Sequence, residues 1–179
     1  TFVAGSSWQP DEDLFIEYFN QHPEVKLIIA PHVIDENHLV EIIRKLKRPY
    51  VRYTRANEKN VRKADCLIID CFGLLSSIYR YGEIAYIGGG FGVGIHNTLE
   101  AAVYGIPVIF GPKYQKFQEA IQLLETKGAF SVKDYEELKT LLDRMLTDEV
   151  FLRESGMNAS NYVTSNAGAT DKIMSMINF

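Results

Sequence analysis

Short apolar runs alternate with longer helical patterns along nearly the whole of this 179-residue sequence. Each run is mostly apolar, as strands covered on both faces must be, and a helical pattern connects it to the next. This alternation predicts an α/β fold, a Rossmann-like three-layer arrangement in which helices cover both faces of a parallel sheet. The strands are predicted at Phe2–Ala4, Lys26–Ala30, Tyr50–Tyr53, Cys66–Asp70, Ile84–Ile87, Val108–Phe110 and Ala129–Ser131.

The helical patterns lie between these strands and continue beyond the last one. In the second pattern, Leu39, Ile42 and Leu46 recur at helical spacing, so one side is expected to pack on the sheet. After Thr147 two helices are expected in series, the second started by a cap at Ser165 or Asn166. The helices are predicted at Asp11–Gln21, Asp35–Leu46, Leu74–Tyr81, Thr98–Tyr104, Phe117–Lys127, Tyr135–Leu146, Glu149–Val163 and Ala167–Ile177.

Composition places the chain among soluble globular domains, with 46% hydrophobic and 23% charged residues. The net charge of −4 is spread without long blocks of one sign, which argues against a surface for nucleic acid or membrane. No apolar run approaches the roughly 20 residues that cross a bilayer. Cys66 and Cys71 are expected to be buried thiols. The sequence starts at Thr1 without Met, which suggests that it is a piece of a longer protein.

A glycine-rich segment after the fifth predicted strand is the strongest functional signal. Five glycines occur in the seven residues from Gly88 to Gly94. Because glycine has no side chain, these amides are expected to approach a phosphate closely, and the helix predicted from Thr98 points its positive end at the same place. Ligands of an open parallel sheet bind beyond the carboxyl ends of its strands, where this segment lies. A turn without a ligand is the alternative.

The segment matches neither common phosphate-loop motif. Gly88, Gly90, Gly92 and Gly94 alternate instead of following the dinucleotide spacing, and Gly-Lys-Ser or Gly-Lys-Thr does not occur. The sequence also lacks a nucleophile elbow, a His-Glu-x-x-His pair and a Cys-x-x-Cys pair. A nucleoside triphosphatase, a hydrolase or a metalloenzyme is therefore disfavoured.

Side chains that follow the glycines extend the predicted site. Glu100 lies three residues after Asn97, in the first turn of the predicted helix, so its carboxylate can reach a ligand hydroxyl. Helix capping by Asn97 and Glu100 is the alternative, and both roles can coexist. His96 and His32 both follow strands at the same edge of the sheet, which favours contact with a ligand, although a structural role is the usual one for a single histidine.

Earlier residues of the chain lie at the same edge. Ser6 and Ser7 offer hydroxyls and amides for an anion, with Ser7 as a simple helix cap the alternative. His22 and His38 are interpreted as solvated helix residues.

Six segments together resemble the bacterial 3-deoxy-D-manno-octulosonic acid (Kdo) transferases. They occur in the order and at about the spacing of that family, and they cover nearly the whole chain, which looks like the family's C-terminal domain. The segments are Gly5-Ser6-Ser7, Ala30-Pro31-His32, Asp70-Cys71-Phe72-Gly73, Ile87-Gly88-Gly89-Gly90, His96-Asn97-Thr98-Leu99-Glu100-Ala101-Ala102 and Gly105-Ile106-Pro107-Val108-Ile109-Phe110-Gly111-Pro112.

The resemblance implies half of a two-domain GT-B glycosyltransferase. Members of the family move Kdo from CMP-Kdo to a lipid A precursor, in lipopolysaccharide biosynthesis at the cytoplasmic face of the inner membrane, without a metal or other cofactor. The acidic catalytic base and the membrane anchor are expected in the N-terminal domain, so this chain alone is expected to bind donor without turnover. The donor-binding residues are expected to be Ser6, Ser7, His32, Gly73, Gly88, Gly89, Gly90, His96, Asn97 and Glu100.

The same resemblance predicts the domain organisation. Residues 1–163 would form the nucleotide-sugar-binding domain, and a helix in residues 164–179 would pack toward the N-terminal domain. Two positions depart from the family pattern, because Pro31 stands where the family usually has arginine and Leu74 where it has glutamate.

Two other interpretations stay open at this point. The first is another GT-B nucleotide-sugar transferase or a UDP-sugar epimerase. The second is a non-catalytic α/β binding domain, in which the glycine segment is only a turn.

Overall fold

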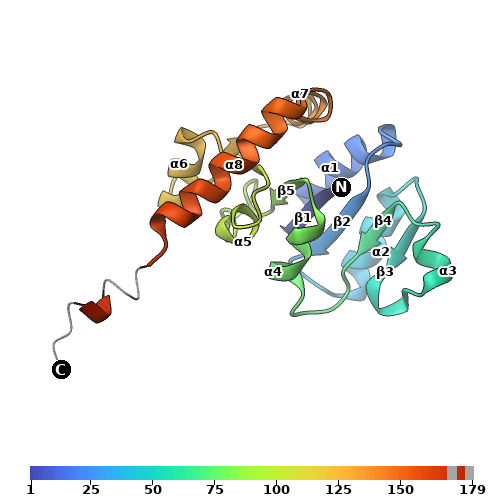
Figure 1. Ribbon diagram of the computed structural model, residues 1–179. Coiled ribbons are helices and arrows are strands. Elements are labelled where there is room, and N and C mark those ends of the chain that lie inside the picture. The colour runs from blue at the N-terminus through green and yellow to red at the C-terminus, as the bar shows by residue number, and fades with distance from the viewer. Residues whose placement is uncertain (169–172, 176–179) are drawn as a thin grey trace.

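A parallel seven-stranded sheet forms the centre of the computed structural model, which describes residues 1–168 and 173–175 (Figure 1). Its strands follow the order β3-β4-β2-β1-β5-β6-β7, and every neighbouring pair runs parallel. Each predicted strand is confirmed, with differences of a few residues at the ends. The strands are β1 (Phe2–Ser7), β2 (Leu27–Pro31), β3 (Tyr50–Arg52), β4 (Cys66–Ile68), β5 (Ile84–Ile87), β6 (Val108–Phe110) and β7 (Ala129–Ser131).

Helices connect the strands, as predicted, but several boundaries differ. The short helix α3 was not predicted, and the helix expected over Thr98–Tyr104 is only four residues long. The helices are α1 (Gln9–Gln21), α2 (Glu36–Lys45), α3 (Glu58–Val61), α4 (Leu75–Ile78), α5 (Leu99–Ala102), α6 (Gln118–Glu125), α7 (Tyr135–Thr147) and α8 (Glu149–Asn166), with 3₁₀ turns at Tyr53–Arg55 and Tyr79–Tyr81.

The end of the chain differs from the prediction. The break expected at Thr164–Asn166 is wrong, because α8 continues without interruption to Asn166. Of the helix expected over Ala167–Ile177, residues 169–172, 176 and 177 lie outside the described residues. Its packing toward another domain therefore stays a prediction.

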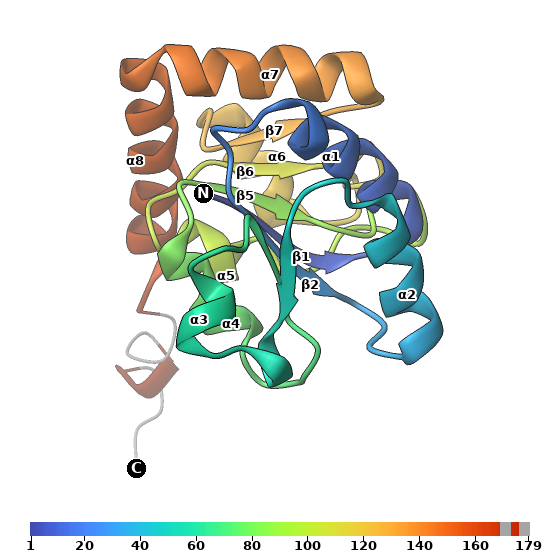
Figure 2. The same ribbon diagram turned by 90° about the vertical axis from the view of Figure 1, so that its right-hand side faces the viewer.

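The two faces of the sheet have separate cores. Phe2 and Ala4 of β1 face the core covered by α1, α2 and α7, whereas Val3 faces the core covered by α4, α5, α6 and α8. This alternation follows from the two-residue period of a strand. In Figure 2, α1 and α2 lie at the right of the sheet, α7 crosses the top and α8 descends at the left. The predicted three-layer architecture is confirmed.

Strand order reverses at β1. From β1 the chain moves to β2 on one side, and β5 later joins β1 on the other side. In open α/β sheets the crevice at such a reversal, beyond the carboxyl ends of the strands, is where ligands bind. The segments that follow β1, β2 and β5 therefore meet at the topological switch point.

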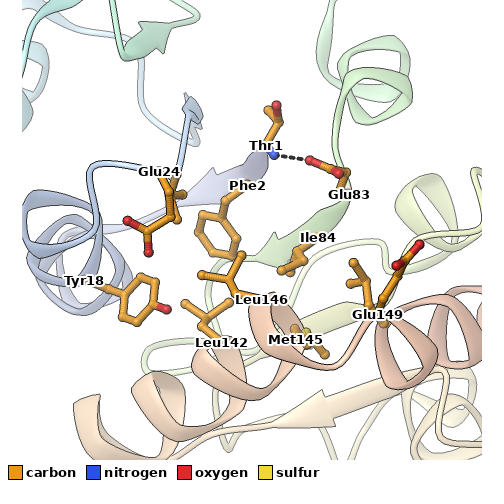
Figure 3. A pocket seen from close by; sticks show the side chains of 12 residues that line it. Thr1, Phe2, Tyr18, Glu24, Glu83, Ile84, Leu142, Met145, Leu146 and Glu149 are labelled. Atoms are coloured by element: carbon orange, nitrogen blue, oxygen red, sulfur yellow. Dashed lines mark hydrogen bonds and ion pairs between the residues drawn. The ribbon is translucent and has the colours of Figure 1, made fainter.

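The opposite end of the sheet has a hollow of its own. A cavity of about 290 Å³ lies at the amino ends of β1 and β5, where Phe2 and Ile84 begin those strands. In Figure 3 the side chains of Leu142, Met145 and Leu146 line it from α7. No residue of the predicted donor site lines this cavity.

Candidate functional site

The connections after β1 and β5 are in backbone contact at the switch point. The Gly88 amide donates to the Gly5 carbonyl over 2.9 Å, and a Cβ on Gly88 would lie 2.2 Å from the Ser6 carbonyl oxygen. Only glycine fits there. Ser6 has φ +52°, a conformation that costs a non-glycine residue about 1–2 kcal/mol. Such backbone strain at the carboxyl end of a strand is typical of a site whose geometry is constrained by its function.

A buried carboxylate holds the glycine segment in place. Asp11, in the first turn of α1, is 1% exposed, and its carboxylate accepts hydrogen bonds from the amides of Gly89 (2.9 Å) and Trp8 (3.0 Å) and from the Tyr86 hydroxyl (3.0 Å). Burial raises the pKa of Asp11 above its ordinary value, although these hydrogen bonds lower it. One side chain therefore joins α1 to β5 and to the segment beyond it.

The expectation that the glycine amides are free for a phosphate is wrong for several of them. The amides of Gly88 and Gly89 are used by Gly5 and Asp11, and those of Gly92 and Gly94 donate to the Gly89 carbonyl. The four residues of α5 also give a weaker dipole than the longer predicted helix would. The segment is a folded turn in which four of the five glycine amides already donate within the protein.

Ser7 does not cap α1. Trp8 occupies that position, and the fully buried Ser7 hydroxyl donates to Glu12 over 2.9 Å. Glu12 is itself fully buried and binds Nε2 of His38 at 2.9 and 3.0 Å. The interpretation of His38 as a solvated residue is therefore wrong. Burial raises the pKa of Glu12, and the bonds from His38 and Ser7 oppose that rise.

Three rings lie together above the switch point. Trp8 stacks on His32 with ring centroids 4.6 Å apart, and His32 stacks on His96 at 4.4 Å. The Trp8 indole N–H also donates to Nε2 of His96 over 3.3 Å. The structure thus brings the two predicted histidines together, as expected, with Trp8 as an additional member.

Asn97 and Glu100 are adjacent at the start of α5. The Asn97 side-chain oxygen accepts from the Leu99 amide over 3.0 Å, and its amide nitrogen donates to Glu100 over 3.2 Å. Asn97 thus bonds the first amide of α5, but Thr98 is the N-cap residue, so the capping box expected from Asn97 and Glu100 does not form. Glu100 remains partly exposed, and its contact with Asn97 leaves its second carboxylate oxygen for another partner.

A cavity of about 240 Å³ lies beside the rings, between the connections that follow β1, β2 and β4. Ser6, His32 and Gly73 all line it, so three predicted site residues share one hollow. Gly73 has φ +89° and open space around its Cα, which keeps this side of the cavity free of a side chain. The histidine pair connects the cavity to the glycine segment.

Gly90 has a structural role at the far side of the site. A Cβ there would lie 2.6 Å from the Gly111 backbone, and the Gly90 carbonyl accepts from the Lys113 amide over 2.9 Å. The exposed Lys113 ammonium in turn donates to the Gly92 carbonyl over 2.9 Å. A cation therefore lies on the glycine segment, although the family arginine is missing at Pro31.

Sequence reasoning missed Trp8, Asp11, Glu12 and Lys113. An acidic residue in the first turn of a helix is usually a solvated partner of the helix dipole, so Asp11 and Glu12 gave no separate signal. Their position in the first turn of the helix that follows Ser6-Ser7 was the available clue. Trp8, the single tryptophan of the chain, directly follows Ser7.

Comparisons with known proteins agree with this architecture. No family model matches the chain. The chain is 34% identical over 151 residues to a 3-deoxy-D-manno-octulosonic acid transferase of Aquifex aeolicus, covering 81% of this chain and 41% of that protein. It is 30% identical over 173 residues to a bifunctional glycosyltransferase/methyltransferase of Fusobacterium nucleatum, covering 90% of this chain and 27% of the relative. The chain thus spans less than half the length of these curated relatives.

A solved structure gives the corresponding part of the fold. The C-terminal CMP-Kdo binding domain of WaaA from Acinetobacter baumannii superposes with a TM-score of 0.79, over 90% of this chain and 88% of that one, at 19% identity. In the described residues, no helix is both long and apolar enough to cross a membrane. With the sequence relatives and the shared architecture together, the chain belongs to the Kdo transferase family and corresponds to the C-terminal half of its GT-B fold.

Proposed function

We propose that this chain is the donor-binding half of a glycosyltransferase that transfers Kdo from CMP-Kdo to a lipid A precursor. The observation that carries the proposal is the meeting of His32, His96 and Glu100 with the glycine segment at the switch point. A related transferase at 34% identity and a CMP-Kdo binding domain of the same fold support this donor.

The chemistry assigned to this half is stabilisation of the leaving group. When an acceptor hydroxyl attacks the sugar carbon, negative charge develops on the CMP phosphate, and donors already in place stabilise it without reorganisation. We assign this role to His96, Asn97 and the Lys113 ammonium. Glu100 suits a sugar or ribose hydroxyl, because a carboxylate accepts hydrogen bonds.

The acceptor and the site of action are part of the same proposal. The lipid A precursor would bind through the N-terminal domain, with the complete enzyme at the cytoplasmic face of the inner membrane. Neither a metal nor another cofactor is required. Transfer by the full-length protein that is abolished by a metal chelator would contradict this part.

Calorimetric titration of this chain with CMP, with UDP as the comparison, tests the donor. We expect selective CMP binding that weakens at least tenfold, about 1.4 kcal/mol, in Glu100→Ala and in His96→Ala. Glu41→Ala, an exposed substitution on α2, serves as the matched control and should leave CMP affinity unchanged. A preference for UDP would change the donor, and failure of the full-length protein to bind either nucleotide would contradict the proposal.

Lys113 provides a separate test of the phosphate position. Removing its charge in Lys113→Ala should weaken CMP binding about fivefold at low salt, since an exposed ion pair contributes about 1 kcal/mol or less. The difference should shrink at high salt, because the charge is exposed to solvent. Lys116→Ala, an exposed lysine on the same connection, is the control. Equal losses in both variants would place the phosphate away from the glycine segment.

A further inference from the structure

The hydrogen bond between Trp8 and His96 determines which nitrogen of the imidazole carries the proton. An indole N–H is a donor only, so Nε2 of His96 must be the acceptor in their 3.3 Å contact. A neutral imidazole has one acceptor and one donor nitrogen. The neutral His96 ring therefore carries its proton on Nδ1.

Several contacts keep the two rings in this relation. The His96 backbone amide donates to the Gly88 carbonyl over 3.2 Å, which ties the residue to the glycine segment. The Trp8 amide is held by Asp11, and His32 stacks against both rings. Nδ1 of His96 has no hydrogen-bond partner among the residues that the structure describes, and the residue is half-buried.

We propose that Trp8 is a positioning residue that holds His96 as the Nδ1–H tautomer, so that the imidazole presents an N–H donor to the phosphate of the bound nucleotide. The identity of the ligand rests on the proposed function. The tautomer does not, because it is a property of the protein without ligand.

The electrostatic surroundings favour the neutral ring. Burial lowers the pKa of His96, and the neighbouring His32 adds to the effect. The Trp8 bond acts in the same direction, because an imidazolium ion has no lone pair left to accept it. His32, the titratable group that faces the ring, stacks directly on it.

Histidine ¹H–¹⁵N correlation spectra of the labelled chain test the proposal, with Trp8→Phe as the variant and His96→Gln to assign the signals. Phenylalanine keeps an aromatic ring against His32 but has no N–H. We expect a protonated Nδ1 and an unprotonated Nε2 for His96 in the natural protein. In Trp8→Phe the two tautomers should mix, and the pKa of His96 should rise.

The natural protein alone can overturn the assignment, even where Trp8→Phe does not fold. A protonated Nε2 in the neutral ring, or averaging of the two tautomers, would do so, as would an unchanged tautomer and pKa in a folded Trp8→Phe variant. CMP affinity gives the second readout, at a pH where the ring is neutral in both proteins. It should fall in Trp8→Phe in proportion to the lost population of the competent tautomer, about twofold if the two tautomers become equally populated. Unchanged CMP affinity despite mixed tautomers would overturn the role at the phosphate.

The two proposals fail in different ways. A fixed Nδ1–H tautomer in a protein that binds no CMP, either as this chain or at full length, would contradict the donor and leave the effect of Trp8 on His96 established. Selective CMP binding with a freely averaging His96 would keep the donor and remove Trp8 from the mechanism.

Discussion

Replacing Asp11 with alanine is expected to lower the free energy of unfolding by about 3 kcal/mol, since three hydrogen bonds to one buried carboxylate are lost and their donors stay behind. The amides of Trp8 and Gly89 and the hydroxyl of Tyr86 would each need a new partner. Urea denaturation with an unchanged m-value would measure the loss as stability. CMP binding should fall as well, because the glycine segment loses its attachment to α1.

The exposed Glu17 offers a matched control on the same helix. Its carboxylate accepts only a long 3.5 Å hydrogen bond from the exposed Gln21 side chain, so Glu17→Ala should change stability by no more than about 0.5 kcal/mol. Equal effects of the two substitutions would show that Asp11 is only another helix carboxylate.

Asp11→Asn separates the charge from the hydrogen bonds. An amide keeps an oxygen for the two backbone donors and a nitrogen that can donate to the Tyr86 oxygen, so it should be tolerated better than alanine. Because the folded pKa of Asp11 is raised, the folded protein holds this proton where the unfolded chain has lost it. The contribution of the Asp11 carboxyl group to the free energy of unfolding therefore falls as pH rises from about 4 through the raised pKa. The stability of Asp11→Asn relative to the natural protein should increase over that range.

Gly88→Ala is expected to cost about 3 kcal/mol or more and to abolish CMP binding. The new methyl group would lie 2.2 Å from the Ser6 carbonyl oxygen and 2.5 Å from the Ser7 Cα, so β1 and β5 would have to separate at the switch point. The clashing atoms belong to the backbone of a central strand, so no side-chain rotation can relieve the clash.

Gly92→Ala is the control within the same segment. Among the described residues, a Cβ at Gly92 would meet only the Gly89 carbonyl oxygen, at 3.7 Å. The stability of Gly92→Ala should therefore stay within about 0.5 kcal/mol of the natural protein. Comparable losses in both variants would mean that glycine is needed for flexibility throughout the segment instead of for close approach at Gly88.

The strands were predictable because short apolar runs between helical patterns are typical of buried parallel strands. The sequences of β1 and β5 are apolar along nearly their whole length, since their residues are buried on both faces of the sheet. The helix α3 gave no such signal, because its four residues include no buried side chain. The continuation of α8 to Asn166 was hidden by Thr164 and Ser165, whose weak helix propensity resembles a break.

The candidate site was predictable in position but not in its supporting contacts. Strand ends placed His32 and His96 at one edge of the sheet, and the structure stacks their rings. The contact of Glu12 with His38 joins residues 26 positions apart on different helices, which no local pattern reveals. The use of the Gly89 amide by Asp11 likewise depends on a contact over 78 positions. Long-range partners of buried polar groups therefore account for most of what sequence reasoning missed.

The central place of β1 has a consequence for synthesis on the ribosome. β1 is made before its neighbours, and one of its edges can pair with β2 soon afterwards, whereas the other edge waits for β5 at Ile84–Ile87. At about 5–20 residues per second, roughly 3–11 s separate the completion of those two neighbours. An apolar strand with an open edge is a template for pairing with another chain. Nascent chains that stall before Ile84 are therefore expected to aggregate through the strand that later carries Ser6 and Ser7 to the site.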